Sequence, residues 1–145
     1  MAKFHYRFES IKKVKETLEK KVQKEISLID MEIEKSNESL QLISDEKAKA
    51  RKIIAGRNNV RVSELQFHNE VEQLLELKAK KIREEVCNLE KAKENKIAEL
   101  AQKTKEHRIF ETLEERHYED YLLLENQAEQ KEIDEIATKK FAREG

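Results

Sequence analysis

The sequence predicts an all-α fold in which two long helices pair as an antiparallel coiled-coil hairpin and the second helix continues past its partner as a C-terminal overhang. Three observations lead to this prediction. Charged residues make up 42% of the chain and hydrophobic residues 37%, which is typical of long solvated helices rather than of a globular core. Apolar residues recur every seven positions on both sides of one short interruption. The chain has no proline and only two glycines.

The interruption predicts a turn between the two helices. Gly56 suits the position just after a helix C-terminus, where the chain turns through positive φ. We expect Ser63 to be the N-cap of the second helix, with Gln66 three residues on completing a capping box. Val62 and Phe67 then stand at the two positions of a hydrophobic staple. The alternative interpretation is a kink within one continuous helix.

We expect residues 1–145 to form a single coiled-coil hairpin, with helix one at about 4–55, a turn at 56–63 and helix two at about 64–141. Two heptad rows mark the seam of the first helix: Val22, Ile29, Ser36, Ile43 and Ala50, and Ile26, Ile33, Leu40, Lys47 and Ile54. The second helix has Leu75, Ile82 and Leu89, then Ala79, Val86, Lys93 and Leu100, and the pattern weakens at Lys96 and Lys103 before Phe110. Lysines at such positions lay their methylenes along the seam.

One register of the two helices brings the apolar rows of the first helix against those of the second. If the turn centres near residue 59, facing residue numbers add up to about 118, which places Ile43 beside Leu75 and Phe8 beside Phe110. A basic start then lies across from an acidic stretch: Lys3, Arg7, Lys12 and Lys15 opposite Glu106, Glu111, Glu114 and Glu115. Such charge pairs set orientation and register more than stability.

This register leaves residues 118–145 without a partner. The overhang is rich in apolar residues: Tyr118, Tyr121, Leu122, Leu123, Leu124, Ala128, Ile133, Ile136, Ala137 and Phe141. A lone helix is only marginally stable in water, and it would expose this surface. We therefore expect it to be covered, either by self-association or fold-back or by a different protein.

No residue pattern points to catalysis, a cofactor or a metal. The chain lacks a glycine-rich phosphate loop, and its four histidines lack the spacing of metal ligands. In the register above, His68 and His107 pack on the seam opposite Ala50 and Ile11. A net charge of −1 gives no field that attracts nucleic acid. We expect a non-enzymatic protein.

The sequence also suggests where the protein acts. Cys87 is the only cysteine, which excludes an internal disulfide and fits a reducing compartment. No run of about 18 apolar residues could span a bilayer, and the chain does not open with a signal peptide. We expect a cytosolic protein without direct membrane insertion.

The C-terminal arm, FETLEERHYEDYLLLENQAEQKEIDEIATKKFAR, resembles the end of the FliJ family of flagellar type III export proteins. The shared positions are Phe110, Leu113, Arg116, Leu122–Leu124, Glu125–Asn126, Gln130–Lys131, Ile133, Asp134–Glu135 and Ala137. The opening KFHYRFESIKKVKE and the segment VSELQFHNEVEQLLE also resemble the family. The similarity extends over the whole chain.

The resemblance implies a stalk-like hairpin that places its terminal end in the hexameric export ATPase FliI, contacts the export-gate protein FlhA and binds export chaperones. It implies a location at the flagellar base, on the inner face of the cell membrane. The ring-facing residues would be Leu113, Arg116, Tyr121, Leu124, Gln130, Asp134 and Glu135. Gate contacts would fall on Val71 and Leu75, although Glu46 and Ala50 replace the aromatic residues expected on the first helix.

Our leading interpretation is an export component that seats its terminal end in the ATPase ring, promotes ring assembly or turnover and links the ring to the gate. The alternative from another class is a structural coiled coil that dimerises through the overhang. The equivalent stalk of a virulence type III system shares the same architecture.

Overall fold

The computed structural model describes residues 3–144, and within them the chain forms two α-helices and no strand. Helix α1 spans Glu9–Ala55 and helix α2 spans Val62–Glu144. This confirms the predicted all-α helical hairpin. The chain divides into two compact units, which we describe separately: the loop unit, residues 21–100, and the terminal unit, residues 3–20 with 101–144. The organisation into a single domain stays a prediction.

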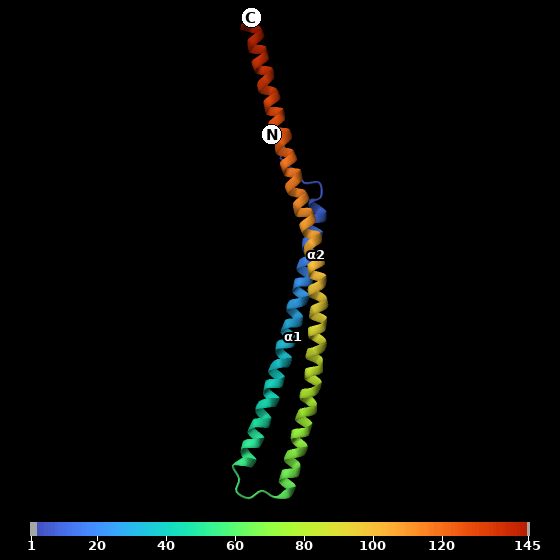
Figure 1. The fold of residues 1–145 in the computed structure, drawn as a ribbon, viewed down its shortest axis with the longest axis vertical. Helices are drawn as coiled ribbons and strands as arrows, with labels where there is room; N and C mark the ends of the chain where they lie inside the picture. Colours follow the sequence, from blue (N-terminus) through green and yellow to red (C-terminus); the bar gives the residue numbers. More distant parts are fainter. Residues whose placement is uncertain (1–2, 145) are drawn as a thin grey trace. The chain divides into compact units, whose positions relative to one another are not determined.

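In the loop unit, α1 and α2 run antiparallel and are joined by residues 56–61 (Figure 1). Every seam position that the heptad pattern predicted in this unit is buried or half-buried. Val22 and Ala79 are the most enclosed, each with 3% of its surface exposed. Apolar residues outside the rows, such as Leu28 and Leu42, are exposed. The seven-residue repeat therefore marks the packing interface in this unit.

Charged residues extend the same interface. The amines of the seam lysines do not end in water but meet carboxylates on the opposite helix: Lys47 pairs with Glu76, Lys93 with Asp30 at 2.7 Å, and Lys96 with Glu25 at 2.7 Å. Their methylenes can lie along the apolar row while the charge is neutralised across it. These hydrogen bonds from lysine lower the pKa of Glu25 and of Glu76, and Arg83 adds to the effect on Glu76.

The same ion pairs correct the expected register. Lys47 pairs with Glu76, where a sum of 118 would have placed it near Val71, and Asp30 likewise pairs five residues beyond its expected partner. Five residues correspond to about 1.4 helical turns. Both registers bring apolar rows into contact, so the apolar repeat alone could not distinguish them. The charged pairs distinguish the two registers.

The end of α1 also differs from the prediction. No residue among 3–144 has positive φ, so Gly56 does not adopt the left-handed conformation that we expected. The Gly56 N–H donates to the Lys52 carbonyl at 3.0 Å, and the Arg57 N–H donates to the Ile54 carbonyl at 3.2 Å. These bonds close α1 with ordinary helical and tightened-turn geometry, which needs no positive φ.

The expected capping box at the start of α2 is wrong. The Arg61 carbonyl accepts the first helical bonds, from the N–H groups of Glu64 and Leu65, both at 3.1 Å, so Ser63 already lies inside the helix. Val62 and Phe67 are exposed and form no staple. The earlier start puts Glu64 in the first turn, where a negative charge is favoured, and its carboxylate accepts a bond from Arg57 at 3.0 Å.

In the terminal unit, α1 begins at Glu9 rather than near residue 4, and residues 3–8 form a non-helical segment that we call the N-terminal strap. The predicted pairing of the basic start with the acidic stretch is confirmed for two pairs: Lys12 contacts Glu114, and Lys15 contacts Glu106 at 3.1 Å. The hydrogen bond from Lys15 holds the pKa of Glu106 below its ordinary value, and Gln102 contributes.

The lowered carboxylate pKa values predict that the hairpin loses stability in acid. In the folded state Glu25, Glu76 and Glu106 titrate below their ordinary value of 4.5, so at acidic pH the unfolded chain binds more protons than the folded chain. This contribution is fully present above about pH 4.5 and is lost as the pH falls through the lowered values. Thermal unfolding followed by circular dichroism between pH 3 and 7 measures the effect.

Glu76→Gln provides the matched comparison, because it removes one of these carboxylates and should flatten the dependence of the melting temperature on pH. Equal melting temperatures for the wild type at pH 3 and pH 7 would contradict the prediction.

Candidate functional site

The N-terminal strap closes the paired part of the terminal unit. Tyr6 is 5% exposed, and its hydroxyl donates to the backbone carbonyl of Phe110 at 2.8 Å. Phe8 packs edge-on against Phe110 with 6.3 Å between ring centroids, so this expected contact is confirmed. His117 lies against the rings of both Tyr6 and Phe8. Burial raises the pKa of Tyr6, with a further rise from the carboxylate of Glu114.

The strap extends the pairing of α2 further than we expected. Phe4 packs on two tyrosines of α2, with its ring centroid 5.3 Å from that of Tyr118 and 5.4 Å from that of Tyr121. The Tyr121 hydroxyl donates to Glu125 at 2.8 Å, and this bond raises the pKa of Tyr121. The expected overhang from residue 118 therefore needs correction, because contacts with the strap reach Tyr121.

Beyond Glu125, α2 has no partner within the described part of the chain. Every residue from 126 to 144 is exposed. We call residues 122–144 the C-terminal end. Its exposed large apolar side chains are Leu122, Leu123, Leu124, Ile133, Ile136 and Phe141, and Phe141 is the most exposed at 79%.

The C-terminal end presents its apolar side chains in more than one direction. Leu122, Leu123 and Leu124 are consecutive, and consecutive helical residues point about 100° apart. Ile133 and Ile136 are three residues apart and share one face. A flat partner could cover the second pair, but the three leucines span about 200° of the helix circumference and require a partner that contacts more than one face.

The seven residues predicted to face the ring lie in different environments. Leu113 and Arg116 line a shallow groove of about 450 Å³ on α2, with Lys105, Arg108, Ile109 and Thr112. Tyr121 is packed under Phe4, whereas Leu124 and Glu135 are exposed. The Gln130 amide donates to the Asp134 carboxylate at 3.3 Å along one helix face. Within the described chain, the structure gathers these residues along one helix rather than into one pocket.

Our sequence reasoning missed the roles of Phe4 and Tyr6. A usable signal was present, because Phe4, Tyr6 and Phe8 alternate with His5 and Arg7. Alternation with period two is typical of an extended segment with one packed face, and not of a helix. That pattern would have predicted a strap where we expected the first turns of helix one.

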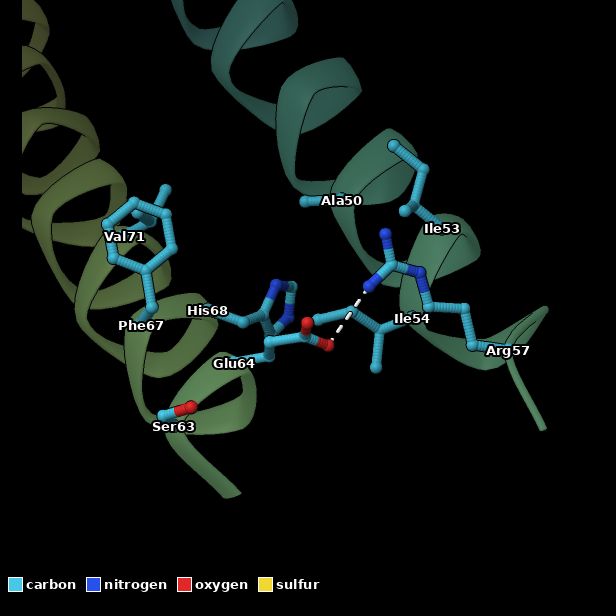
Figure 2. Close-up of a pocket in the computed structure, with 9 residues that line it drawn as sticks. All are labelled: Ala50, Ile53, Ile54, Arg57, Ser63, Glu64, Phe67, His68 and Val71. Carbon is cyan, nitrogen blue, oxygen red and sulfur yellow. Dashed lines mark hydrogen bonds and ion pairs between the residues drawn. The ribbon is translucent and has the colours of Figure 1, made fainter. Parts of the chain in front are cut away.

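A second candidate surface lies in the loop unit, where α1 and α2 diverge towards the loop (Figure 2). A pocket of about 480 Å³ opens there, which we call the loop pocket. Its lining is Ala50, Ile53, Ile54, Arg57, Ser63, Glu64, Phe67, His68 and Val71. In Figure 2 the ion pair between Arg57 and Glu64 crosses the space between the helices.

The loop pocket includes one of the two predicted gate residues. Val71 lines it and is half-buried, whereas Leu75 is half-buried further along the seam and does not line it. His68 and Ala50, which the sequence placed opposite each other, both line this pocket. Phe67 and Ile53 add large exposed apolar side chains to its rim. The pocket can therefore accept an apolar side chain from a partner.

His107 forms a second enclosed polar contact in the terminal unit. Its Nδ1 lies 2.8 Å from Glu19, and its Nε2 lies 3.4 Å from Glu111. Thr104 donates to the other oxygen of Glu19 at 3.1 Å. The expected neighbour of His107 was Ile11, and the structure pairs it with Glu19 instead. Among the residues that the structure describes, no group of histidine, cysteine or carboxylate side chains is arranged to hold a metal ion.

The fold and these surfaces define a long α-helical hairpin whose C-terminal end and loop pocket expose apolar side chains. The sequence profile of the family described as "Flagellar FliJ protein" matches residues 4–145, essentially the whole chain. The chain belongs to the FliJ family and is a component of the flagellar type III protein export apparatus, a role that the family fills as a structural rather than a catalytic protein.

No curated protein and no solved structure matches the chain. Neither helix, over the residues described, contains a stretch long and apolar enough to cross a membrane.

The contacts of the strap predict that Tyr6→Phe destabilises the terminal unit. The substitution keeps the buried ring but removes the donor to the Phe110 carbonyl, and a bond of this kind contributes about 0.5–1.5 kcal/mol. Tyr118→Phe is the matched control, because the Tyr118 side chain is 46% exposed. Hydrogen exchange of the α2 amides around residue 110 should accelerate in Tyr6→Phe only. Equal exchange in both variants would show that the bond contributes nothing.

Proposed function

We propose that this protein seats its C-terminal end in the hexameric export ATPase, promotes assembly or turnover of the ring, and links the ring to the export gate. The observation that carries the proposal is the exposed apolar surface of residues 122–144, which spans about 200° of the helix circumference at Leu122–Leu124. A ring of subunits is the kind of partner that can cover a helix from every side. The protein would then act in the cytoplasm at the flagellar base.

The magnitude of the exposed surface supports this proposal. Fully burying one side chain such as Ile133, Ile136 or Phe141 yields roughly 1.5–3 kcal/mol, so these three together yield about 5–9 kcal/mol. A micromolar complex has a binding free energy of about −8 kcal/mol. Because association itself has a cost, the leucines and the polar residues of this end would have to contribute as well.

We assign ring contacts to Leu113, Arg116, Tyr121, Leu124, Gln130, Asp134 and Glu135, on the family resemblance together with their positions on α2. We add Leu122, Ile133, Ile136 and Phe141 because they are exposed and apolar. Arg116 could pair with a carboxylate of the ring, since no ion pair within the described chain involves it. Binding of export chaperones is proposed from the family alone.

A truncation tests the proposal. Ending the chain after Glu125 keeps the Tyr121–Glu125 bond and all contacts of the strap, and it removes only residues that lack a partner in the described chain. The truncated protein should keep its thermal stability but lose stimulation of the export ATPase. The double variant Ile133→Ser/Ile136→Ser should lose most of the stimulation, whereas Leu42→Ser in the loop unit should not.

Undiminished stimulation by the truncated chain would refute ring docking. If the full chain instead sediments as a tight dimer, the truncated chain as a monomer, and ATPase activity is the same with both, the structural scaffold would be the correct function.

We further propose that the loop pocket receives an apolar side chain of the export-gate protein, with Val71 at its wall and Leu75 further along α2. The pocket is open, its lining is mostly apolar, and the rim residues Ile53 and Phe67 are exposed. These features suit a short apolar segment such as a linker of a membrane protein.

Val71→Asp tests the gate site by placing a carboxylate in the pocket wall. Binding of the soluble linker segment of the gate protein should weaken at least about tenfold, because an apolar contact is replaced by a charge that must be desolvated. Leu74→Asp is the control, since Leu74 is exposed and does not line the pocket. ATPase stimulation should be normal in both variants. Equal affinity of Val71→Asp and wild type for the linker would exclude this site.

A further inference from the structure

The described contacts between the strap and α2 differ in strength along the strap. At its base, Tyr6 is almost fully buried and is fixed by the hydrogen bond to Phe110 and by the ring of His117. At its tip, Phe4 is only half-buried and touches α2 through the rings of Tyr118 and Tyr121. The tip can therefore lift away while the base stays in place.

The surface under the tip is continuous with the exposed C-terminal end. Tyr118 and Tyr121 immediately precede the three leucines at 122–124, and Tyr118 is already partly exposed. The apolar surface of α2 thus does not stop where the strap stops. Phe4 occupies its first turn.

We propose that the strap is a tethered cover: Phe4 occupies the aromatic pair Tyr118–Tyr121, and a ring subunit of the export ATPase displaces Phe4 to gain this extra turn of α2. The inference rests on the proposed docking of the C-terminal end. It adds that Phe4 and the ATPase compete for the same turn of α2. The partner surface that replaces Phe4 would be apolar or aromatic, because it has to match the contacts that Phe4 gives up.

The two possible roles of Phe4, as a competitor or as a part of the docking surface, predict opposite changes in affinity for the ATPase when its ring is removed. If Phe4 is a cover, the ATPase has to break the contacts of Phe4 before it binds. Removing the ring eliminates this cost, and the affinity for the ATPase rises. If Phe4 is itself part of the docking surface, removing its ring lowers the affinity. One aromatic contact of ordinary strength corresponds to a change of roughly two- to tenfold, so the loss of two corresponds to at least about fivefold.

The first experiment compares Phe4→Ala with wild type in full-length protein, using the purified hexameric export ATPase as the probe. We expect Phe4→Ala to bind at least about fivefold more tightly. Leu42→Ala is the matched control, because it removes an exposed apolar side chain in the loop unit and should leave the affinity unchanged. Circular dichroism verifies that both variants are folded.

The second experiment holds residue 4 against residue 118 with a covalent bridge, so that the strap cannot be displaced. Phe4→Cys and Tyr118→Cys are combined with Cys87→Ser, so that a short reducible bis-maleimide can bridge only the two new thiols. The bridged protein should bind the ATPase more weakly, and reductive cleavage of the bridge should restore binding. The same molecule before and after cleavage is its own control for the two substitutions.

Weaker binding of Phe4→Ala to the ATPase, or equal binding of the bridged and cleaved forms, would refute the proposal that Phe4 competes with the ATPase. These outcomes are distinct from failure of the proposed function, which the truncation after Glu125 reports. If that truncation abolishes binding while Phe4→Ala has wild-type affinity, docking stands and the competition is wrong.

Discussion

The structure depends on one constraint: each amphipathic helix must bury its apolar stripe against another segment of the chain, and the available partner is shorter than the stripe. Helix α1 has 47 residues and α2 has 83. Two paired helices cover only one face of each other, so among the apolar residues described only Val22, Ala79 and Tyr6 are buried, with 3–5% of their surface exposed. The strap adds further cover in the terminal unit, and the remainder of α2 stays exposed.

Because the apolar seam is narrow, charged side chains take a large part in specifying the pairing. Lysines stand within the seam and reach carboxylates on the opposite helix, as with Lys47 and Glu76 or Lys93 and Asp30. Each such pair contributes little free energy at a solvated surface. Their collective effect is to select one register among those that the apolar repeat allows, and this register determines where the exposed part of α2 begins.

The two candidate surfaces follow from the same constraint. The C-terminal end is exposed because no segment in the described chain is left to pair with it, and the loop pocket opens where α1 and α2 diverge before the loop (Figure 2). Membership of the FliJ family places the protein in the flagellar export apparatus. An export component that works by contact needs apolar surface that its own fold leaves free, and both units supply such surface.

The sequence by itself determined the fold class, the seam and the exposed apolar end, because heptad spacing is a property of consecutive residues and needs no knowledge of the partner. It also contained the period-two pattern of Phe4, Tyr6 and Phe8, which we read as helix. Only the tertiary structure decided the register and the packing of Phe4 on Tyr121. Each of these depends on a contact between residues far apart in the chain, where several arrangements satisfy the same local pattern and long-range packing selects one of them.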